Sequence, residues 1–228
     1  MNFKALLASF TPSFDPVPLP EKIRTGLAAL AGTLLLGLAL RYLSQPGYPL
    51  IMLASSAAAA VLLYAVPHSP MTQPWPVVGG NLLSGLAGWM CSLIIPDPVL
   101  AAGCAVGLAI FVMHLSHCLH PPGGATAMAM VLGAEQFQHH GWVWAVSVVL
   151  ANTILSLLLA LIINNLIPGR HYPMRRAAMP QTVAGSALGQ EDIEWALTQM
   201  DGVIDVSEED LLDIYRLASG HARERAAK

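Results

Sequence analysis

Hydrophobic residues dominate the chain from residue 25 to residue 169, where the only charged side chains are those of Arg41, Asp97 and Glu135. A helix needs roughly 20 apolar residues to cross the hydrocarbon core of a bilayer. Four stretches reach that length, and they predict four transmembrane helices at residues 23–43, 77–95, 99–119 and 142–167.

Two further apolar stretches, residues 50–66 and 122–133, are short or broken; the first follows Pro49 and the second begins at Pro122. They can be tilted helices that cross the bilayer, or half-helices that enter and turn back. Each lies between two longer stretches, so the chain reads as two units of long, short and long helix. Short interrupted segments at matching places in two halves are typical of transporters, so we expect a 3+3 internal repeat.

These segments define an all-α membrane protein in four parts. Residues 1–20 form an N-terminal segment, and residues 21–176 form the transmembrane domain. Residues 177–190 have the composition of a linker. Residues 191–228 combine apolar residues at helical spacing with many acidic residues, which predicts a water-facing helical hairpin as a tail.

The composition excludes several classes of protein. The chain is 55% hydrophobic and 11% charged, whereas a soluble domain has about 25% charged residues. The sequence contains no basic patch for nucleic acid, no paired catalytic carboxylates and no metalloprotease motif, so we expect neither nucleic-acid binding nor enzymatic activity. Nothing resembles a phosphate-binding loop, and no cofactor is predicted. The three cysteines do not form a disulfide framework.

Basic residues indicate the orientation. Lys4, Lys22 and Arg24 precede the first long stretch, and Arg170 with residues 175–176 follows the last. Positively charged flanks stay on the cytoplasmic side of a membrane. We therefore expect both termini in the cytoplasm and a bacterial-type inner membrane as the location.

The sequence HLSHCLHPPGGATA, residues 114–127, carries the most distinctive chemistry. Proline is favoured at the first turn of a helix, so one helix should end before residue 121 and another should begin there. The first N–H groups of such a helix lack partners within it, and together they form an anion site. His120 would stand at its mouth and add charge or relay a proton. The predicted binding residues are His120, Pro121, Pro122, Gly123, Gly124, Ala125 and Thr126.

Other polar or small residues lie in apolar surroundings and are candidates for the same site. Ser55 and Ser56 begin the other short segment, and their alternative role is hydrogen bonding to their own helix. The remaining candidates are Gly79, Gly80, Asn81 and Asn164. Polar groups at membrane depth tend to be functional.

Two alternative functions remain open. His114, His117 and Cys118 share neighbouring faces of a helix and could bind zinc or copper. The same residues can instead pack between helices or line a cavity, and no metal site is our first expectation. In the second alternative, the protein is a membrane sensor or scaffold that acts through its acidic tail, docked on its own membrane domain or on a second copy in a homo-oligomer.

Three blocks of the sequence resemble the HPP family of integral membrane proteins. The run His120-Pro121-Pro122-Gly123-Gly124 is similar to the family signature, and the similarity extends, in order, over roughly residues 20–175. The other two blocks are Ser69-Pro70-Met71 with Gln73-Pro74 and Val78-Gly79-Gly80-Asn81, and Asn164-Asn165-Leu166 with Tyr172-Pro173.

The resemblance implies a small protein with four transmembrane helices. Photosynthetic members are implicated in nitrite transport, and longer members add a pair of CBS domains, for which this chain is too short. His114 and His117 lie outside the family pattern. The leading hypothesis is a transporter or channel for a small monovalent anion, nitrite first, with the lipid bilayer and the anion as partners.

Overall fold

A computed structural model describes residues 17–174 and Tyr215. In these residues the chain forms seven α-helices and one short 3-10 helix, without a β-strand, which confirms the all-α fold class. The elements are α2 (Leu19–Leu43), α3 (Ser55–Ala65), η1 (Pro70–Thr72), α4 (Pro74–Ile94), α5 (Pro98–Leu115), α6 (Pro122–Leu132), α7 (Ala134–His140) and α8 (Trp142–Leu166).

Four of these helices, α2, α4, α5 and α8, are long and apolar enough to cross a membrane, as predicted. Proline begins several of them, because its fixed backbone angle and missing N–H suit the first helical turn. At α5, Asp97 before Pro98 also caps the helix, since its Oδ1 accepts a hydrogen bond of 2.7 Å from the Leu100 N–H.

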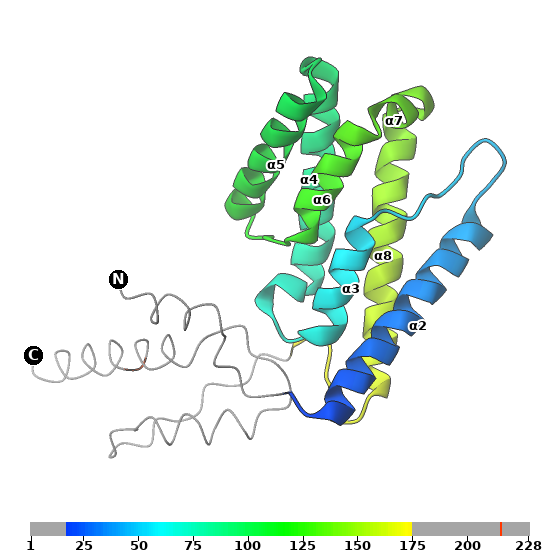
Figure 1. The fold of residues 1–228 in the computed structure, drawn as a ribbon, viewed down its shortest axis with the longest axis vertical. Coiled ribbons are helices and arrows are strands. Elements are labelled where there is room, and N and C mark those ends of the chain that lie inside the picture. Colours follow the sequence, from blue (N-terminus) through cyan, green and yellow to red (C-terminus); the bar gives the residue numbers. More distant parts are fainter. Residues whose placement is uncertain (1–16, 175–214, 216–228) are drawn as a thin grey trace, which may run out of the picture.

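The two short helices, α3 and α6, have 11 residues each. At 1.5 Å per residue each is about 16 Å long, roughly half the hydrocarbon core of a bilayer. Both begin near the middle of the molecule and run toward opposite ends (Figure 1). Neither helix is therefore long enough by itself to cross the hydrocarbon core. The order α2–α3–α4 is followed by α5–α6–α8, which agrees with the expected 3+3 repeat.

The structure also corrects parts of the prediction. Helix α5 ends at Leu115 rather than residue 119, because Ser116 to Pro121 form the break between α5 and α6. Residues 50–53 are extended and lead into α3. Helix α7 was not predicted. The linker 177–190 lies outside the described residues, as does the tail hairpin 191–228 except for Tyr215.

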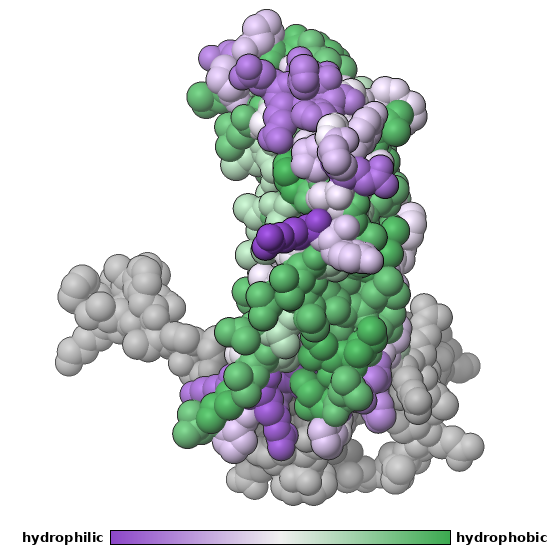
Figure 2. Space-filling view, turned by 90° about the vertical axis from the view of Figure 1, so that its right-hand side faces the viewer, coloured by the Kyte–Doolittle hydropathy of each residue, from purple (hydrophilic) through white to green (hydrophobic). Residues whose placement is uncertain are grey.

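Large apolar side chains cover much of the outer surface, as expected where lipid replaces water. Figure 2 shows a broad hydrophobic region above polar residues at the lower end, while other polar residues gather near the upper end. On α2 alone, Leu27, Leu30 and Leu34 are each more than half exposed. A water-soluble protein rarely exposes such a patch, so the chain is an integral membrane protein.

Candidate functional site

A single asparagine of α8 holds the start of α3. The Asn152 Oδ1 atom accepts hydrogen bonds from Ser56 Oγ at 2.9 Å and from the Leu53 N–H at 3.0 Å. Its Nδ2 group donates to the carbonyl oxygen of Ile51 at 2.8 Å and to that of Val148 at 2.9 Å. The side chain thus satisfies backbone groups of the extended segment that would otherwise be unpaired inside the membrane.

A second asparagine, in α4, holds α6 in the same way. The Asn81 Oδ1 atom accepts a hydrogen bond of 2.6 Å from Thr126 Oγ1, and its Nδ2 group donates to the Val77 carbonyl at 2.9 Å. Both asparagines bond to the carbonyl four residues earlier in their own helix, and both are buried. The predicted residues Ser56, Asn81 and Thr126 therefore belong to two contacts that share an asparagine-to-hydroxyl bond, although only Asn152 also bonds backbone groups before the short helix.

A small pocket lies beside the start of α3. It has room for about one water molecule. Its polar lining comes from α3, α4 and α8 and contains no charged residue; the lining residues are Leu53, Ser55, Ser56, Ala59, Val77, Asn81, Asn152, Thr153 and Ser156. Of the predicted site residues, Ser55, Ser56 and Asn81 meet here.

The start of α6 differs from the prediction. The Gly123 N–H donates to the His120 carbonyl at 2.8 Å, and the Gly124 N–H donates to the Pro121 carbonyl at 3.1 Å. Pro121 and Pro122 have no N–H to offer. The expectation that the amides of Gly123 and Gly124 are free to bind an anion is therefore wrong.

The glycines near this helix start allow close packing instead. A Cβ atom on Gly80 of α4 would lie 2.6 Å from His120 Cβ, and one on Gly123 would lie 2.6 Å from Ser84 Oγ. Real Cβ atoms do not approach so closely, so a side chain at either position would push α4 and α6 apart. A Cβ atom on Gly79 would be less crowded, at 3.2 Å from Cys118 Cβ, and one on Gly124 would lie 3.9 Å from Val106 Cγ1.

His120 is fully buried beside this contact. Its Nδ1 atom lies 2.8 Å from the Met71 carbonyl oxygen, which can only accept, so Nδ1 carries the proton. The Nε2 atom then bears a lone pair, and among the described residues it is the one buried side-chain nitrogen or oxygen without a hydrogen-bond partner. His120 thus has an unused acceptor at the break between α5 and α6.

Asn164 lies away from the pocket, at the other end of α3. Its Nδ2 group donates to the Leu63 carbonyl at 3.0 Å, and its Oδ1 atom accepts from Arg170 at 3.2 Å. Arg170 also donates to the Tyr64 carbonyl at 2.9 Å and to Thr25 Oγ1 at 3.0 Å, and it pairs with Glu21. This cluster joins the C-terminal end of α3 to α2 and α8, and a cation there complements the helix dipole.

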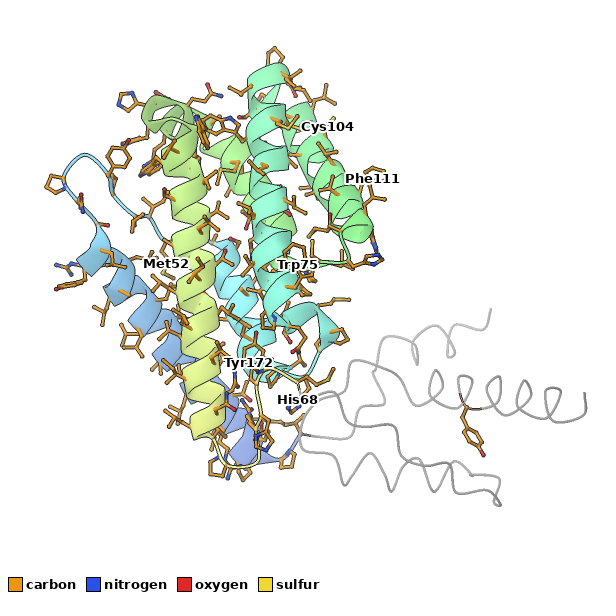
Figure 3. All side chains as sticks on the ribbon, turned by 180° about the vertical axis from the view of Figure 1, so that it is seen from behind. Met52, His68, Trp75, Cys104, Phe111 and Tyr172 are labelled. Carbon is orange, nitrogen blue, oxygen red and sulfur yellow. The ribbon has the colours of Figure 1, made fainter. Side chains whose placement is uncertain are left out.

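The same end of the molecule carries a second contact to the segment after α8. Tyr172 Oη donates a hydrogen bond of 2.5 Å to the Thr72 carbonyl in η1. At the same end of the molecule (Figure 3), His68 Nε2 lies 3.1 Å from the carbonyl oxygen of His171. Burial, and secondarily the nearby Tyr64, raises the pKa of Tyr172 well above its usual value. The phenol therefore remains a hydrogen-bond donor throughout the physiological pH range.

The alternative metal ligands are not brought together. His114 and His117 are exposed, whereas Cys118 is fully buried. Within residues 17–174 no group of three or more His, Cys, Asp or Glu side chains is arranged to hold a metal ion. The metal set proposed from the sequence is therefore not supported.

Four residues of these clusters were missed from the sequence: Asn152, Thr153, Ser156 and Arg170. One signal was available, because Val77-Val78-Gly79-Gly80-Asn81 and Val148-Val149-Leu150-Ala151-Asn152 share two valines and an asparagine at the same spacing. The hydroxyls of Thr153 and Ser156 follow this second asparagine on α8.

Comparison with known proteins agrees with this architecture. Residues 15–173 match the transmembrane region of the HPP family. A transmembrane protein of Dictyostelium discoideum is 34% identical over 177 residues, which cover 75% of this chain and 62% of the relative. A second transmembrane protein of that organism is 35% identical over 152 residues, which cover 65% of this chain and 49% of the relative.

The chain thus spans less than two thirds of the length of either relative. No solved structure matches it. The family match extends from before α2 to the residues after α8 and so includes both asparagine contacts and the pocket. This chain therefore belongs to the HPP family of transmembrane proteins.

Proposed function

We propose that this protein moves a small monovalent anion across the membrane and that the anion binds in the pocket beside the start of α3. The observation that carries the proposal is the lining of that pocket, where six uncharged polar side chains lie among the apolar residues Leu53, Ala59 and Val77. The resemblance of the HPP signature to that of nitrite-transporting members makes nitrite the first anion to test. We expect no chemical conversion of the solute.

The polarity of the pocket favours an anion over a cation. The amino-terminal end of a helix carries a partial positive charge, and α3 begins at Ser55 in the pocket wall. The Ser56 and Ala57 N–H groups at the start of α3 are bonded to carbonyl groups three residues earlier, as at the start of α6, so this helix end adds its partial positive charge but not those two N–H groups. Hydroxyl groups of Ser55, Thr153 and Ser156 can donate to an anion there. Because a fixed Lys or Arg is absent from the lining, binding would be weak enough for release, which transport requires.

This placement differs from the site expected from the sequence. The helix start at Pro122 is filled by close packing, so His120 to Gly124 are now assigned to the contact between α4 and α6. The unpartnered Nε2 atom of His120 is fully buried and lies outside the pocket lining, and we keep from the sequence the proposal that His120 adjusts the charge near the pathway.

Uptake into liposomes tests the proposed function. The purified chain, reconstituted in vesicles, should admit nitrite and should exclude sodium and potassium. On α8, Ser156→Ala should reduce the initial rate because Ser156 lines the pocket. Ser147→Ala on the same helix is the matched control, since Ser147 Oγ bonds only to the Val143 carbonyl and is exposed. Equal rates for both variants would place the pathway elsewhere, and absence of anion uptake would refute the proposal.

The proposed location is a bacterial-type inner membrane with the ends of the transmembrane region on the cytoplasmic side. Lys22, Arg24 and Arg170 lie at the end of the molecule where α2 begins and α8 ends (Figure 1). In a Cys104→Ser background, a membrane-impermeant thiol reagent added outside intact cells should label Asp97→Cys but not His171→Cys. The reverse labelling pattern would invert the orientation.

A further inference from the structure

The helices pack as two triplets that differ from the two halves of the sequence. One hydrophobic cluster is built from α4, α5 and α6, with members such as Cys91, Ala105 and Ala127. Another is built mainly from α2, α3 and α8, with members such as Ala28, Leu63 and Ala160. We call these the first and the second triplet. Each contains one short helix and two long ones.

The triplets are built alike. In the first, Asn81 of α4 accepts a hydrogen bond from Thr126 of the short helix α6, and in the second, Asn152 of α8 accepts one from Ser56 of the short helix α3. The short helices run in opposite directions (Figure 1). This relation is that of inverted repeats, in which α2, α3 and α4 correspond to α5, α6 and α8. Each short helix is fastened to the long helix of the other repeat.

Hydrogen bonds hold each triplet together. Among the described residues, hydrogen bonds that link the two triplets involve the connecting segments, such as the bond from Tyr172 Oη to the Thr72 carbonyl, rather than two of the six helices. Among residues 17–174, every side-chain hydrogen bond between two of these six helices lies within one triplet, as the Asn81–Thr126 and Asn164–Leu63 contacts do. Beside the pocket, the contact between triplets includes apolar packing of α4 on α8: a Cβ atom on Gly85 would lie 3.2 Å from Val149 Cγ2. An apolar interface between small and branched residues can shift without breaking directional bonds.

The proposed anion pocket lies at this interface. Val77 and Asn81 of the first triplet face α3 and α8 of the second across it. The space holds about one water molecule, which is smaller than nitrite, so the triplets must separate locally before an anion can enter. The corresponding place at the start of α6 is filled, because Gly123 lies against Ser84 and Gly80.

The starts of α3 and α6 are equivalent in the two repeats, but one borders a pocket and the other is tightly packed. Such a difference is expected if the protein alternates between two conformations and the structure shows one of them. We propose that the protein is a carrier rather than a channel, in which the two triplets move against each other and expose the pocket to the two sides of the membrane in turn. This inference rests on the proposed function, and it adds an activity, exchange of one anion for another.

Counterflow distinguishes the two mechanisms. Vesicles containing the full chain are loaded with unlabelled nitrite, and the uptake of isotopically labelled nitrite from an equal outside concentration is measured. The binding site of a carrier reorients faster with an anion bound than when it is empty. Internal nitrite should therefore raise the initial uptake rate several-fold over that of vesicles loaded with gluconate. An unchanged rate, with net nitrite flux still present, would identify a channel and overturn the inference while the proposed function stands.

A cross-link provides the second measurement. In a background without native cysteines, Gly85→Cys and Val149→Cys place two thiols at the interface between the triplets. Oxidation should abolish uptake, and reduction should restore it, whereas the single variants should be insensitive to oxidation. If nitrite uptake persists when the two triplets are joined by a disulfide, the proposal of a carrier is overturned. If wild-type vesicles admit neither nitrite, nitrate nor chloride, the proposed function itself fails and the inference fails with it.

Discussion

Asn152 of α8 binds Ser56 of α3 across 96 residues of sequence, with 2.9 Å between Asn152 Oδ1 and Ser56 Oγ. The same side chain also binds the backbone of Ile51 and Leu53, so four hydrogen bonds converge on one buried amide. An extended segment at membrane depth is tolerated only where its backbone groups find partners in the protein. Asn152 is therefore the residue that permits α3 to begin in the middle of the molecule.

Replacement of this amide should destabilise the fold. In Asn152→Leu the side chain keeps nearly the same volume, but the Leu53 N–H and the Ile51 carbonyl lose their partner. An unsatisfied buried group costs about 1–3 kcal/mol, and we expect a loss of that size in the free energy of unfolding. The measurement is equilibrium unfolding in mixed detergent micelles, followed by circular dichroism.

Ser147→Ala, on the same helix, is the control for this variant and should change stability by less than about 0.5 kcal/mol. Asn152→Gln should recover part of the loss, since it retains the amide on a longer side chain. If Asn152→Leu is as stable as the wild type, the hydrogen bonds at the start of α3 do not hold the extended segment.

Among the basic residues that the structure describes, Arg170 should be the one whose replacement lowers the stability most. Only 7% of its side chain is exposed, and it contacts Glu21, Thr25, Tyr64 and Asn164. Arg170→Met leaves the partly buried Glu21 carboxylate without this partner, and breaking a buried ion pair costs about 3 kcal/mol. We expect a comparable loss of stability in the same unfolding assay.

Arg24 offers a matched comparison, because it also lies near Glu21, at 3.8 Å, but 54% of its side chain is exposed. Arg24→Met should cost less than about 0.5 kcal/mol. In Glu21→Gln, the further effect of Arg170→Met should shrink by about 1–3 kcal/mol, which is the coupling energy of the pair. Additive effects of the two substitutions would show that Arg170 and Glu21 do not interact.

The architecture could be predicted because its physical cause is local in sequence. Length and hydropathy identified all four long helices, and proline at residue 122 identified the start of α6. Helix α7 was missed because its seven residues, AEQFQHH, contain too few apolar positions for a periodic pattern. The end of α5 was misplaced because Cys118 and Leu119 are apolar although they lie in the break between two helices.

The site was predicted less well, since it depends on contacts between distant segments. Ser56 and Asn81 were identified as polar residues in apolar surroundings, but their partners Asn152 and Thr126 are fixed by how α8 and α6 pack. The glycines of the HPP signature suggested room for a ligand. In the folded protein that room is taken by α4, a distinction that only the packing of the helices reveals.

Chelation should leave transport unchanged. His114 and His117 are exposed while Cys118 is buried, so they do not form a shared coordination site. Purified protein treated with EDTA should take up the anion at the untreated rate, and His117→Ala should behave as wild type. Stoichiometric zinc or copper by elemental analysis, lost together with uptake in His117→Ala, would contradict this expectation.

Gly80 and Gly103 separate the packing role of glycine from its effect on helix propensity. Both lie inside long helices, but a Cβ at Gly80 meets His120 Cβ at 2.6 Å and the Cys118 carbonyl at 2.8 Å, whereas nothing lies within 4 Å of one at Gly103. Overpacking a tight contact costs about 1–3 kcal/mol, while Ala in place of Gly favours a helix by about 1 kcal/mol.

Gly80→Ala should therefore lower stability and uptake together, because it forces α6 away from α4 and moves Thr126 off Asn81. Gly103→Ala should be neutral or slightly stabilising, with uptake unchanged, in parallel unfolding and liposome assays. If Gly80→Ala is tolerated as well as Gly103→Ala, the close approach of α4 and α6 does not determine the position of Thr126.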